Sequence, residues 1–89
     1  MPLYAAHYET ACMTRQDLGQ VAGNVHSAGG ACRSRQFFVS FSSGHLLWMF
    51  EAPDREVLER WLQVLRMGNY QWLARIDYEG TDGTLPDAR

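Results

Sequence analysis

The chain has 89 residues, 46% of them hydrophobic and 12% aromatic, which excludes a disordered chain and allows one small domain with a single core. Its formal net charge is −2, and its eight basic residues, all arginine, form no patch that would favour a nucleic-acid backbone. We expect neither a signal peptide nor a membrane partner, because no charged and apolar leader opens the chain and no apolar run could span a bilayer.

In chain order, the first expected elements are a strand and a helix. Leu3 to Glu9 has the composition of a strand, and Thr14 with Asp17 forms a capping-box-like pair that predicts a helix start. Gly29-Gly30 ends this helix, which we expect over residues 14–28. Apolar side chains at helical spacing predict a buried stripe. The stripe consists of Leu18, Val21, Ala22 and Val25.

Two further strands form a predicted hairpin. The second strand runs from Gln36 to Ser42 and the third from His45 to Glu51. The short connection Ser42-Ser43-Gly44 is typical of a tight turn between antiparallel strands. His45, next to this turn, is interpreted as an exposed hairpin residue.

The stretch Phe50-Glu51-Ala52-Pro53-Asp54 leads from the third strand into the second helix. Asp54 suits the N-cap, because its carboxylate can accept a backbone N–H. We expect the helix over residues 54–67, with Gly68-Asn69 as its stop. Trp72 to Glu79 is then the fourth strand. The buried stripe of this helix consists of Leu58, Trp61, Leu62 and Leu65.

This order, β-α-β-β-α-β, predicts an α+β domain with the ferredoxin-like fold. Right-handed crossovers place both helices on one face of a four-stranded antiparallel sheet. We expect the domain to cover residues 1–79 and residues 80–89 to form a flexible C-terminal tail.

The face of the sheet that the helices leave open decides the predicted function. The third strand is apolar on both sides, so Leu47 and Met49 would be exposed unless a second subunit covers them. We therefore expect a homodimer, a dimeric α+β barrel that encloses a pocket. In the fourth strand the set of Trp72, Ala74, Ile76 and Tyr78 is expected to meet the helices. The residues assigned to the open face are His7, Glu9, Phe38, Ser40, Glu51, Arg75 and Asp77.

Several of these side chains are candidates for chemistry. His7 and Glu9 point the same way, as an acid–base pair or, with Glu51, as metal ligands; the alternative is a partly solvated strand end. Glu51 is either a buried acid with a raised pKa or a partner of backbone groups in the turn. We name His7 and Glu51 as candidate catalytic residues, and His7 and Glu9 as candidate metal ligands.

Other open-face residues are candidates for holding a ligand. Arg75 and Asp77 could anchor a carboxylate or phenolate, or form a cross-strand ion pair. The predicted ligand-binding set is Glu9, Phe38, Ser40, Leu47, Met49, Arg75 and Asp77.

The run Leu46-Leu47-Trp48-Met49-Phe50-Glu51-Ala52-Pro53-Asp54, followed by Val57, resembles a family of small bacterial ferredoxin-like proteins that are uncharacterised and in part nickel-binding. More broadly, the architecture resembles the dimeric α+β barrel superfamily, which includes cofactor-independent monooxygenases, lactone isomerases and polyketide cyclases. The resemblance implies a homodimer with an enclosed site, and a fold-level likeness transfers no catalytic residue.

Three functions follow as hypotheses. The first is a dimeric barrel that binds a small ligand or a divalent metal such as nickel, with no cofactor required. The alternative is a cofactor-independent cyclase, isomerase or monooxygenase acting on an aromatic or polyketide-like molecule. The third is an interaction protein whose sheet face is only an interface. Nothing in the sequence points to export, so we expect Cys12 and Cys32 to be reduced thiols and the protein to be cytoplasmic.

Overall fold

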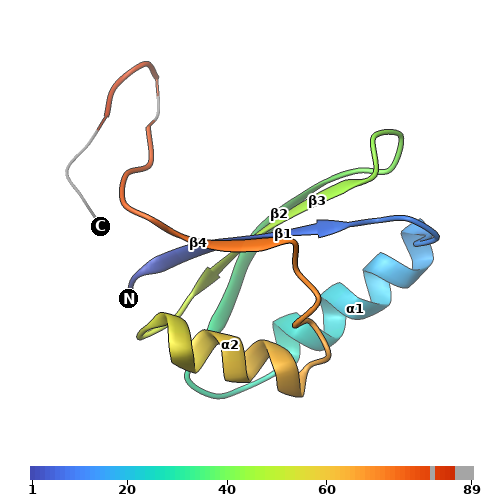
Figure 1. Cartoon of the computed structure of the whole chain (residues 1–89), viewed down its shortest axis with the longest axis horizontal. Helices are drawn as coiled ribbons and strands as arrows, with labels where there is room; N and C mark the ends of the chain where they lie inside the picture. The colour runs from blue at the N-terminus through green and yellow to red at the C-terminus, as the bar shows by residue number, and fades with distance from the viewer. Residues whose placement is uncertain (81, 86–89) are drawn as a thin grey trace.

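The computed structural model describes residues 1–80 and 82–85, and the order of elements along them is the expected one. The four strands form one antiparallel sheet in the order β2-β3-β1-β4. Both helices lie against the same face of this sheet (Figure 1), so the ferredoxin-like α+β architecture is confirmed. The elements are β1 (Leu3–Glu9), α1 (Arg15–Ser27), β2 (Arg33–Ser40), β3 (His45–Glu51), α2 (Arg55–Val64) and β4 (Trp72–Ile76).

Both helix starts form as their capping residues predict. At α1, the N–H of Asp17 donates to the Thr14 hydroxyl and the N–H of Thr14 donates to the Asp17 carboxylate, each at 3.1 Å. The bond from the Thr14 backbone N–H holds the pKa of Asp17 below its usual value. At α2, the Asp54 carboxylate accepts from the N–H of Val57 at 2.9 Å. The two caps satisfy backbone donors that the helices themselves leave unpaired.

The second strand differs most from its predicted bounds. It begins at Arg33 and ends at Ser40, and its register with β3 shifts by one residue between Ser34 and Gln36. Ser34 lies on the core side of this bulge, where its hydroxyl accepts from the indole N–H of Trp48 at 2.8 Å. The turn to β3 contains Gly44 at φ +77°, a conformation that glycine adopts without strain.

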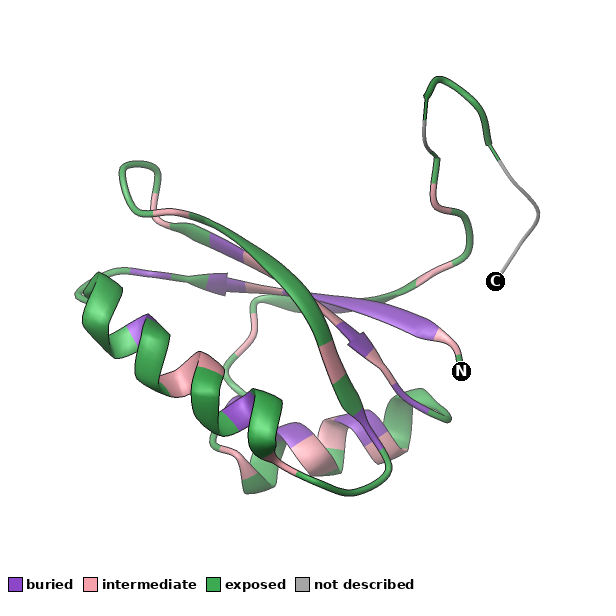
Figure 2. Cartoon of the chain, turned by 180° about the vertical axis from the view of Figure 1, so that it is seen from behind, coloured by how far each residue is buried: buried purple, intermediate pink, exposed green. Residues whose placement is uncertain are grey.

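The core lies between the helices and one face of the two central strands. Tyr4, Ala6 and Tyr8 of β1 and Leu46, Trp48 and Phe50 of β3 are all buried there. Leu18 and Val25 of α1, with Leu58 and Leu62 of α2, cover them from the helix side. In Figure 2 the buried residues follow these central strands and the inward faces of the helices. No helix in the described part of the chain is both long and apolar enough to cross a membrane.

The fourth strand presents the opposite face from the one expected. Trp72 pairs with His7 and is 47% exposed, whereas Leu73 pairs with the small Ala6 and is buried in the core. Arg75 pairs with Tyr4, so it lies on the helix side. The prediction that Trp72 meets the helices is therefore wrong, and so is the assignment of Arg75 to the open face.

The strand also ends earlier than expected, at Ile76, so Asp77 lies beyond the sheet. The chain then leaves β4 on the open side of the sheet (Figure 1). Of the tail expected over residues 80–89, positions 81 and 86–89 lie outside the described residues.

Candidate ligand site on the open sheet face

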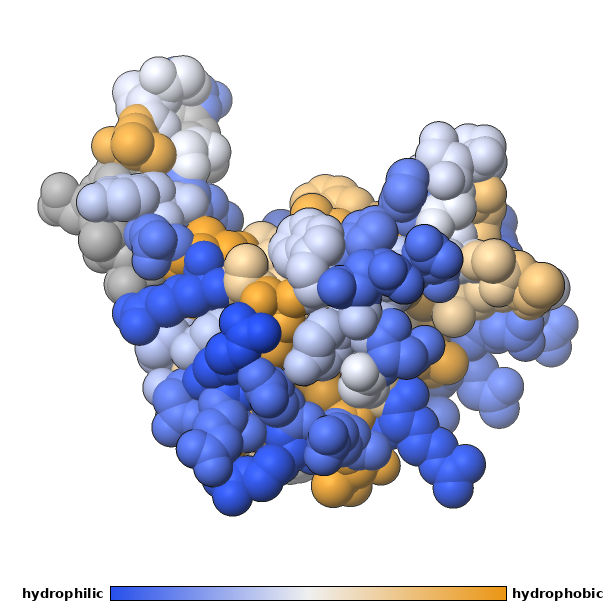
Figure 3. All heavy atoms as spheres, viewed as in Figure 1, coloured by the Kyte–Doolittle hydropathy of each residue, from blue (hydrophilic) through white to orange (hydrophobic). Residues whose placement is uncertain are grey.

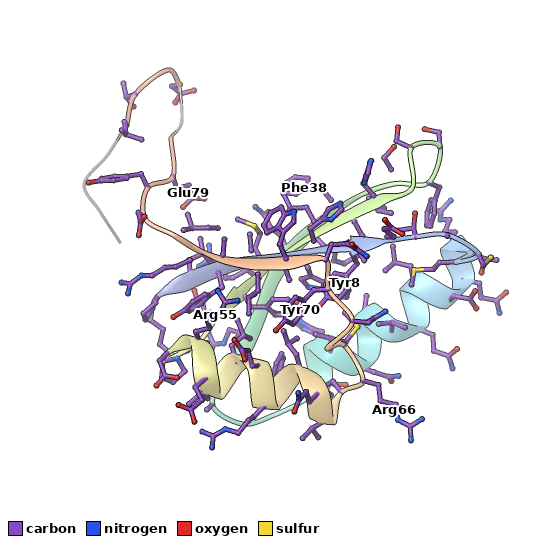
Figure 4. The ribbon with its side chains drawn as sticks, viewed as in Figure 1. Tyr8, Phe38, Arg55, Arg66, Tyr70 and Glu79 are labelled. Carbon is purple, nitrogen blue, oxygen red and sulfur yellow. The ribbon has the colours of Figure 1, made fainter. Side chains whose placement is uncertain are left out.

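The open face is built from one row of side chains on each strand, and the strand registers fix which residues lie side by side. In Figure 4, Phe38 stands on this face, while Tyr8 and Tyr70 lie on the helix side. The space-filling view shows a hollow over the sheet between the β2–β3 hairpin and the segment after β4 (Figure 3). The rows are Trp72, Ala74 and Ile76 on β4, Leu3, Ala5, His7 and Glu9 on β1, His45, Leu47, Met49 and Glu51 on β3, and Gln36, Phe38 and Ser40 on β2.

Most of this surface is apolar. Leu3 is only 3% exposed although the helices lie on the other side of the sheet, because its neighbours on β3 and β4 cover it. Two aromatic rings stand out from the face, Phe38 at 58% exposed and Trp72 at 47%. An aromatic ring supplies a large apolar contact area, so these two side chains are suited to a partner or a ligand.

His7 lies near the middle of the face and contacts two side chains that are remote in the sequence. Its Nε2 is 3.0 Å from Nδ1 of His45, and the two rings are tilted by 39°. Its ring also stacks on Trp72, with centroids 5.6 Å apart and planes 12° apart. The N–H of Gln71 donates to the carbonyl of His7 at 2.7 Å, which brings the start of β4 to this position.

The second ring nitrogen of His7, Nδ1, is buried and has no hydrogen-bond partner among the described residues. In a neutral imidazole one nitrogen donates and the other accepts, so this atom is an unpaired donor or an unpaired acceptor. Leaving such a group unpaired costs about 1–3 kcal/mol, and buried polar groups are rarely left so. His7 therefore keeps one buried ring nitrogen unpaired, directly beside its contact with His45.

His45 is exposed beside the hairpin turn, as expected, but the sequence interpretation did not assign it to the site. It pairs with Glu9 on β1 and with Ser40 on β2, so three polar residues meet at this end of the face. The Ser40 hydroxyl accepts from the N–H of Ser43 at 3.3 Å, which gives it a role in the turn. The available signal was the antiparallel register: once β1 and β3 pair, His7 and His45 are diagonal neighbours.

Glu51 lies at the other end of β3 and does not meet His7. It pairs with Leu3, four residues from His7, which is about 13 Å along a strand that rises about 3.3 Å per residue. Its carboxylate accepts from Arg35 at 2.5 Å. The hydrogen bond from Arg35 holds the pKa of Glu51 below its usual value. The interpretation of Glu51 as a buried acid with a raised pKa is therefore wrong.

The structure thus brings together most, but not all, of the predicted site residues. His7, Glu9, Phe38, Ser40, Leu47 and Met49 share the open face, as expected from strand alternation. Glu51 shares the face but lies apart from His7, and Arg75 and Asp77 are not on it. Their proposed roles in ligand binding or catalysis stay predictions.

A metal ion would find an incomplete set of ligands here. Among residues 1–80 and 82–85, no three His, Cys, Asp or Glu side chains converge to hold one. The two nitrogens of His7 and His45 are half of a tetrahedral set. The expectation of a divalent metal such as nickel, with His7 and Glu9 as ligands, therefore stays a prediction.

Comparisons with protein-family models, with curated proteins and with solved structures each found no match to this chain. The resemblance to small bacterial, in part nickel-binding proteins thus rests on the nine-residue run and on the fold. The two cysteines are free thiols, Cys12 exposed and Cys32 buried, and burial raises the pKa of Cys32.

Proposed function

We propose that the chain is a homodimeric barrel that binds a small organic molecule between two open sheet faces. The observation that carries this proposal is the cluster of His7, His45 and Trp72 on an apolar surface. Small-molecule sites combine apolar walls with a few convergent polar groups. Here, the walls are Leu47, Met49 and the two exposed rings, and the polar group is the His7–His45 pair.

A second copy of the chain is the partner that best suits this face. The helices cover only one side of the sheet, and a domain of this size gains stability from burying the other side. A two-fold interface uses the same patch on both subunits, which an apolar, low-charge surface permits. The main charged pair on the face, Arg35 with Glu51, is already paired within the chain and can lie at the rim.

The size of the sheet face predicts a role for the segment after β4. Four strands about 4.8 Å apart and about six residues long form a face of roughly 20 by 20 Å, or about 400 Å². A standard interface buries roughly 800 Å² on each partner, so the sheet face alone is too small. Tyr78 and Leu85, in the segment that rises on the open side, are 51% and 69% exposed. We propose that this segment packs on the second subunit and completes the interface.

The ligand that suits the site is planar and aromatic, with one hydrogen-bonding group. Its ring would pack against Trp72 and Phe38, and its polar group would meet the His7–His45 pair. Such a molecule, rather than a metal, uses what the described residues offer. The free thiols agree with a reducing compartment, and a cytoplasmic location is part of the proposal.

One observation favours the second candidate, a cofactor-independent enzyme. Two imidazoles joined by a hydrogen bond can pass a proton, and histidine is the commonest general acid and base. In this reading the exposed His45 exchanges a proton with an enclosed substrate through its second ring nitrogen, and His7 takes or returns the proton across the bond between the two rings. The substrate class is the same aromatic molecule.

The ligand proposal is tested by recording the ring-nitrogen resonances of His7 and His45 during titration with a panel of phenols, naphthols and aromatic acids. We expect a member of the panel to shift both histidines saturably in the wild type, and to bind at least tenfold more weakly to Trp72→Ala. His26→Ala, an exposed histidine of α1, is the matched control and should bind like the wild type. Histidine resonances that respond to no member of the panel would count against the proposal, and conversion of the bound molecule would favour the enzyme.

A further inference from the structure

We propose a second binding site, on the helix side of the sheet, for a small monocyclic aromatic molecule with a hydroxyl substituent. The site is a cavity of about 140 Å³ between α1, the sheet and the connection from α2 to β4. It is separate from the open face, because its floor consists of core residues. It therefore stands or falls independently of the function proposed above.

The floor of the cavity is apolar and rigid. It consists of Tyr8, Leu46 and Trp48, and the exposed fraction of each residue is below 5%. The indole of Trp48 is held by its bond to Ser34, and the Tyr8 hydroxyl donates to the carbonyl of Met67 at 2.7 Å. An apolar cavity of about 150 Å³ is large enough to bind benzene, so this volume fits one six-membered ring.

Two methionines form the adaptable part of the wall. Met13 precedes α1 and Met67 follows α2, so the cavity lies where the two connections meet. A methionine side chain is unbranched and fits its shape to irregular contents. The cavity can thus adjust to rings that differ by a methyl or a hydroxyl group.

The backbone is strained at the residue directly before each of these methionines. Cys12, directly before Met13, has φ +65°, and Arg66, directly before Met67, has φ +60°. Side chains other than glycine rarely adopt this left-handed conformation, and such outliers gather at functional sites. Arg66 adopts it where α2 ends and Cys12 in the turn after β1, so the cavity lies between two sharp backbone turns.

The mouth of the cavity decides the polar group of the ligand. Arg66 and Asn69 line the mouth and carry hydrogen-bond donors, whereas the side chain of Glu9 stands on the open face of the sheet. A hydroxyl on the ligand can accept a hydrogen bond from Arg66 or Asn69, which favours a phenol over an unsubstituted ring.

Methionine methyl resonances give a direct test, because the chain has four methionines in different places. Met13 and Met67 line the cavity, Met49 lies on the open face and Met1 is at the N-terminus. We expect toluene and p-cresol to shift Met13 and Met67 saturably, and a shift of Met49 would report separate binding on the open face. p-Cresol should bind several-fold more tightly than toluene. Shifts confined to Met49, or shifts that do not saturate up to the solubility limit, would overturn the proposal.

Substitutions separate the cavity from the surface. Val21→Phe fills the cavity and should weaken the binding of toluene and of p-cresol at least tenfold. Val64→Phe makes the same change at a side chain of α2 that is 83% exposed, and it should leave both affinities unchanged. If Val21→Phe does not fold, Val21→Leu replaces it in the test and should weaken binding to an intermediate extent. Arg66→Gly should reduce the p-cresol affinity to that of toluene. Equal affinities in wild type and Val21 variants would overturn the site, and an unchanged p-cresol preference in Arg66→Gly would overturn the hydroxyl assignment.

Discussion

Nε2 of His7 lies 3.0 Å from Nδ1 of His45, although the two residues are 38 positions apart in the chain. The contact exists because β1 and β3 pair antiparallel with Glu9 opposite His45 and His7 opposite Leu47. Both rings therefore stand on the same face of adjacent strands. This pair is the central polar feature of a sheet face that is mostly apolar.

The first prediction concerns the energy of this pair. In a double-mutant cycle of His7→Ala and His45→Ala, we expect a coupling of about 0.5–1.5 kcal/mol in the free energy of unfolding, which is the usual net contribution of one hydrogen bond. Urea denaturation measures it. His7→Ala combined with His26→Ala is the control and should be additive, since His26 is exposed on α1. Additivity of the His7 and His45 variants would show that the bond contributes nothing.

The second prediction concerns the buried hydroxyl of Tyr8. Burial raises its pKa far above the usual value near 10, and Met67 accepts its hydrogen bond. A group whose pKa is raised in the folded protein contributes stability that is present below the unfolded pKa and lost as pH rises. Tyr8→Phe should therefore lower stability by about 1 kcal/mol at pH 7. Denaturation curves between pH 7 and 11 should show a smaller alkaline loss in the variant than in the wild type; parallel losses would contradict this.

The third prediction concerns strain at Arg66. Its N–H donates to Gln63 at 3.0 Å and the next N–H, of Met67, donates to Leu62 at 2.7 Å, so the end of α2 has the bonds of a Schellman motif. The left-handed position of this motif favours glycine. Arg66→Gly should raise stability by about 0.5–1 kcal/mol. Thermal unfolding measures the change, and Arg60→Gly, within α2, should lower stability. A loss of stability in Arg66→Gly would mean that the arginine side chain outweighs the backbone strain.

How far the sequence alone leads can be seen by comparing strands. β1 and β3 have the predicted bounds, since the residues at their ends mark where each central strand starts and stops. β4 has the right alternation but the opposite phase, because composition favoured the tryptophan set for the core, whereas the short edge strand needs only Leu73 there. That single inversion placed Arg75 on the wrong face.

The site shows the same limit. His7 could be found because it lies on a strand whose phase was right, and His45 was missed because its partner is set by the register between strands. The contact of Glu51 with Arg35 was hidden by the bulge in β2, which no residue pattern announces. Local signals thus predicted the elements, and pairing between distant strands decided the chemistry.

The fourth prediction concerns the Arg35–Glu51 pair. Arg35 lowers the pKa of Glu51, so the pair adds stability above the usual glutamate pKa and loses it as pH falls through the lowered value. Glu51→Gln should reduce stability at pH 7 and approach the wild type under acid conditions. Denaturation at pH 7 and at pH 3 measures the difference, with Glu56→Gln on α2 as control. A difference that is the same at both pH values would contradict the electrostatic account.

The central claim, that two open sheet faces pack together, is tested most directly by light scattering during size exclusion at micromolar concentration. We predict twice the chain mass of 10.2 kDa for the wild type. Met49→Asp, which places a charge in the proposed interface, should give the monomer mass with the secondary structure unchanged. Val64→Asp, exposed on α2, should remain a dimer. A wild-type mass near 10 kDa, or a Met49→Asp protein that stays dimeric, would contradict the account.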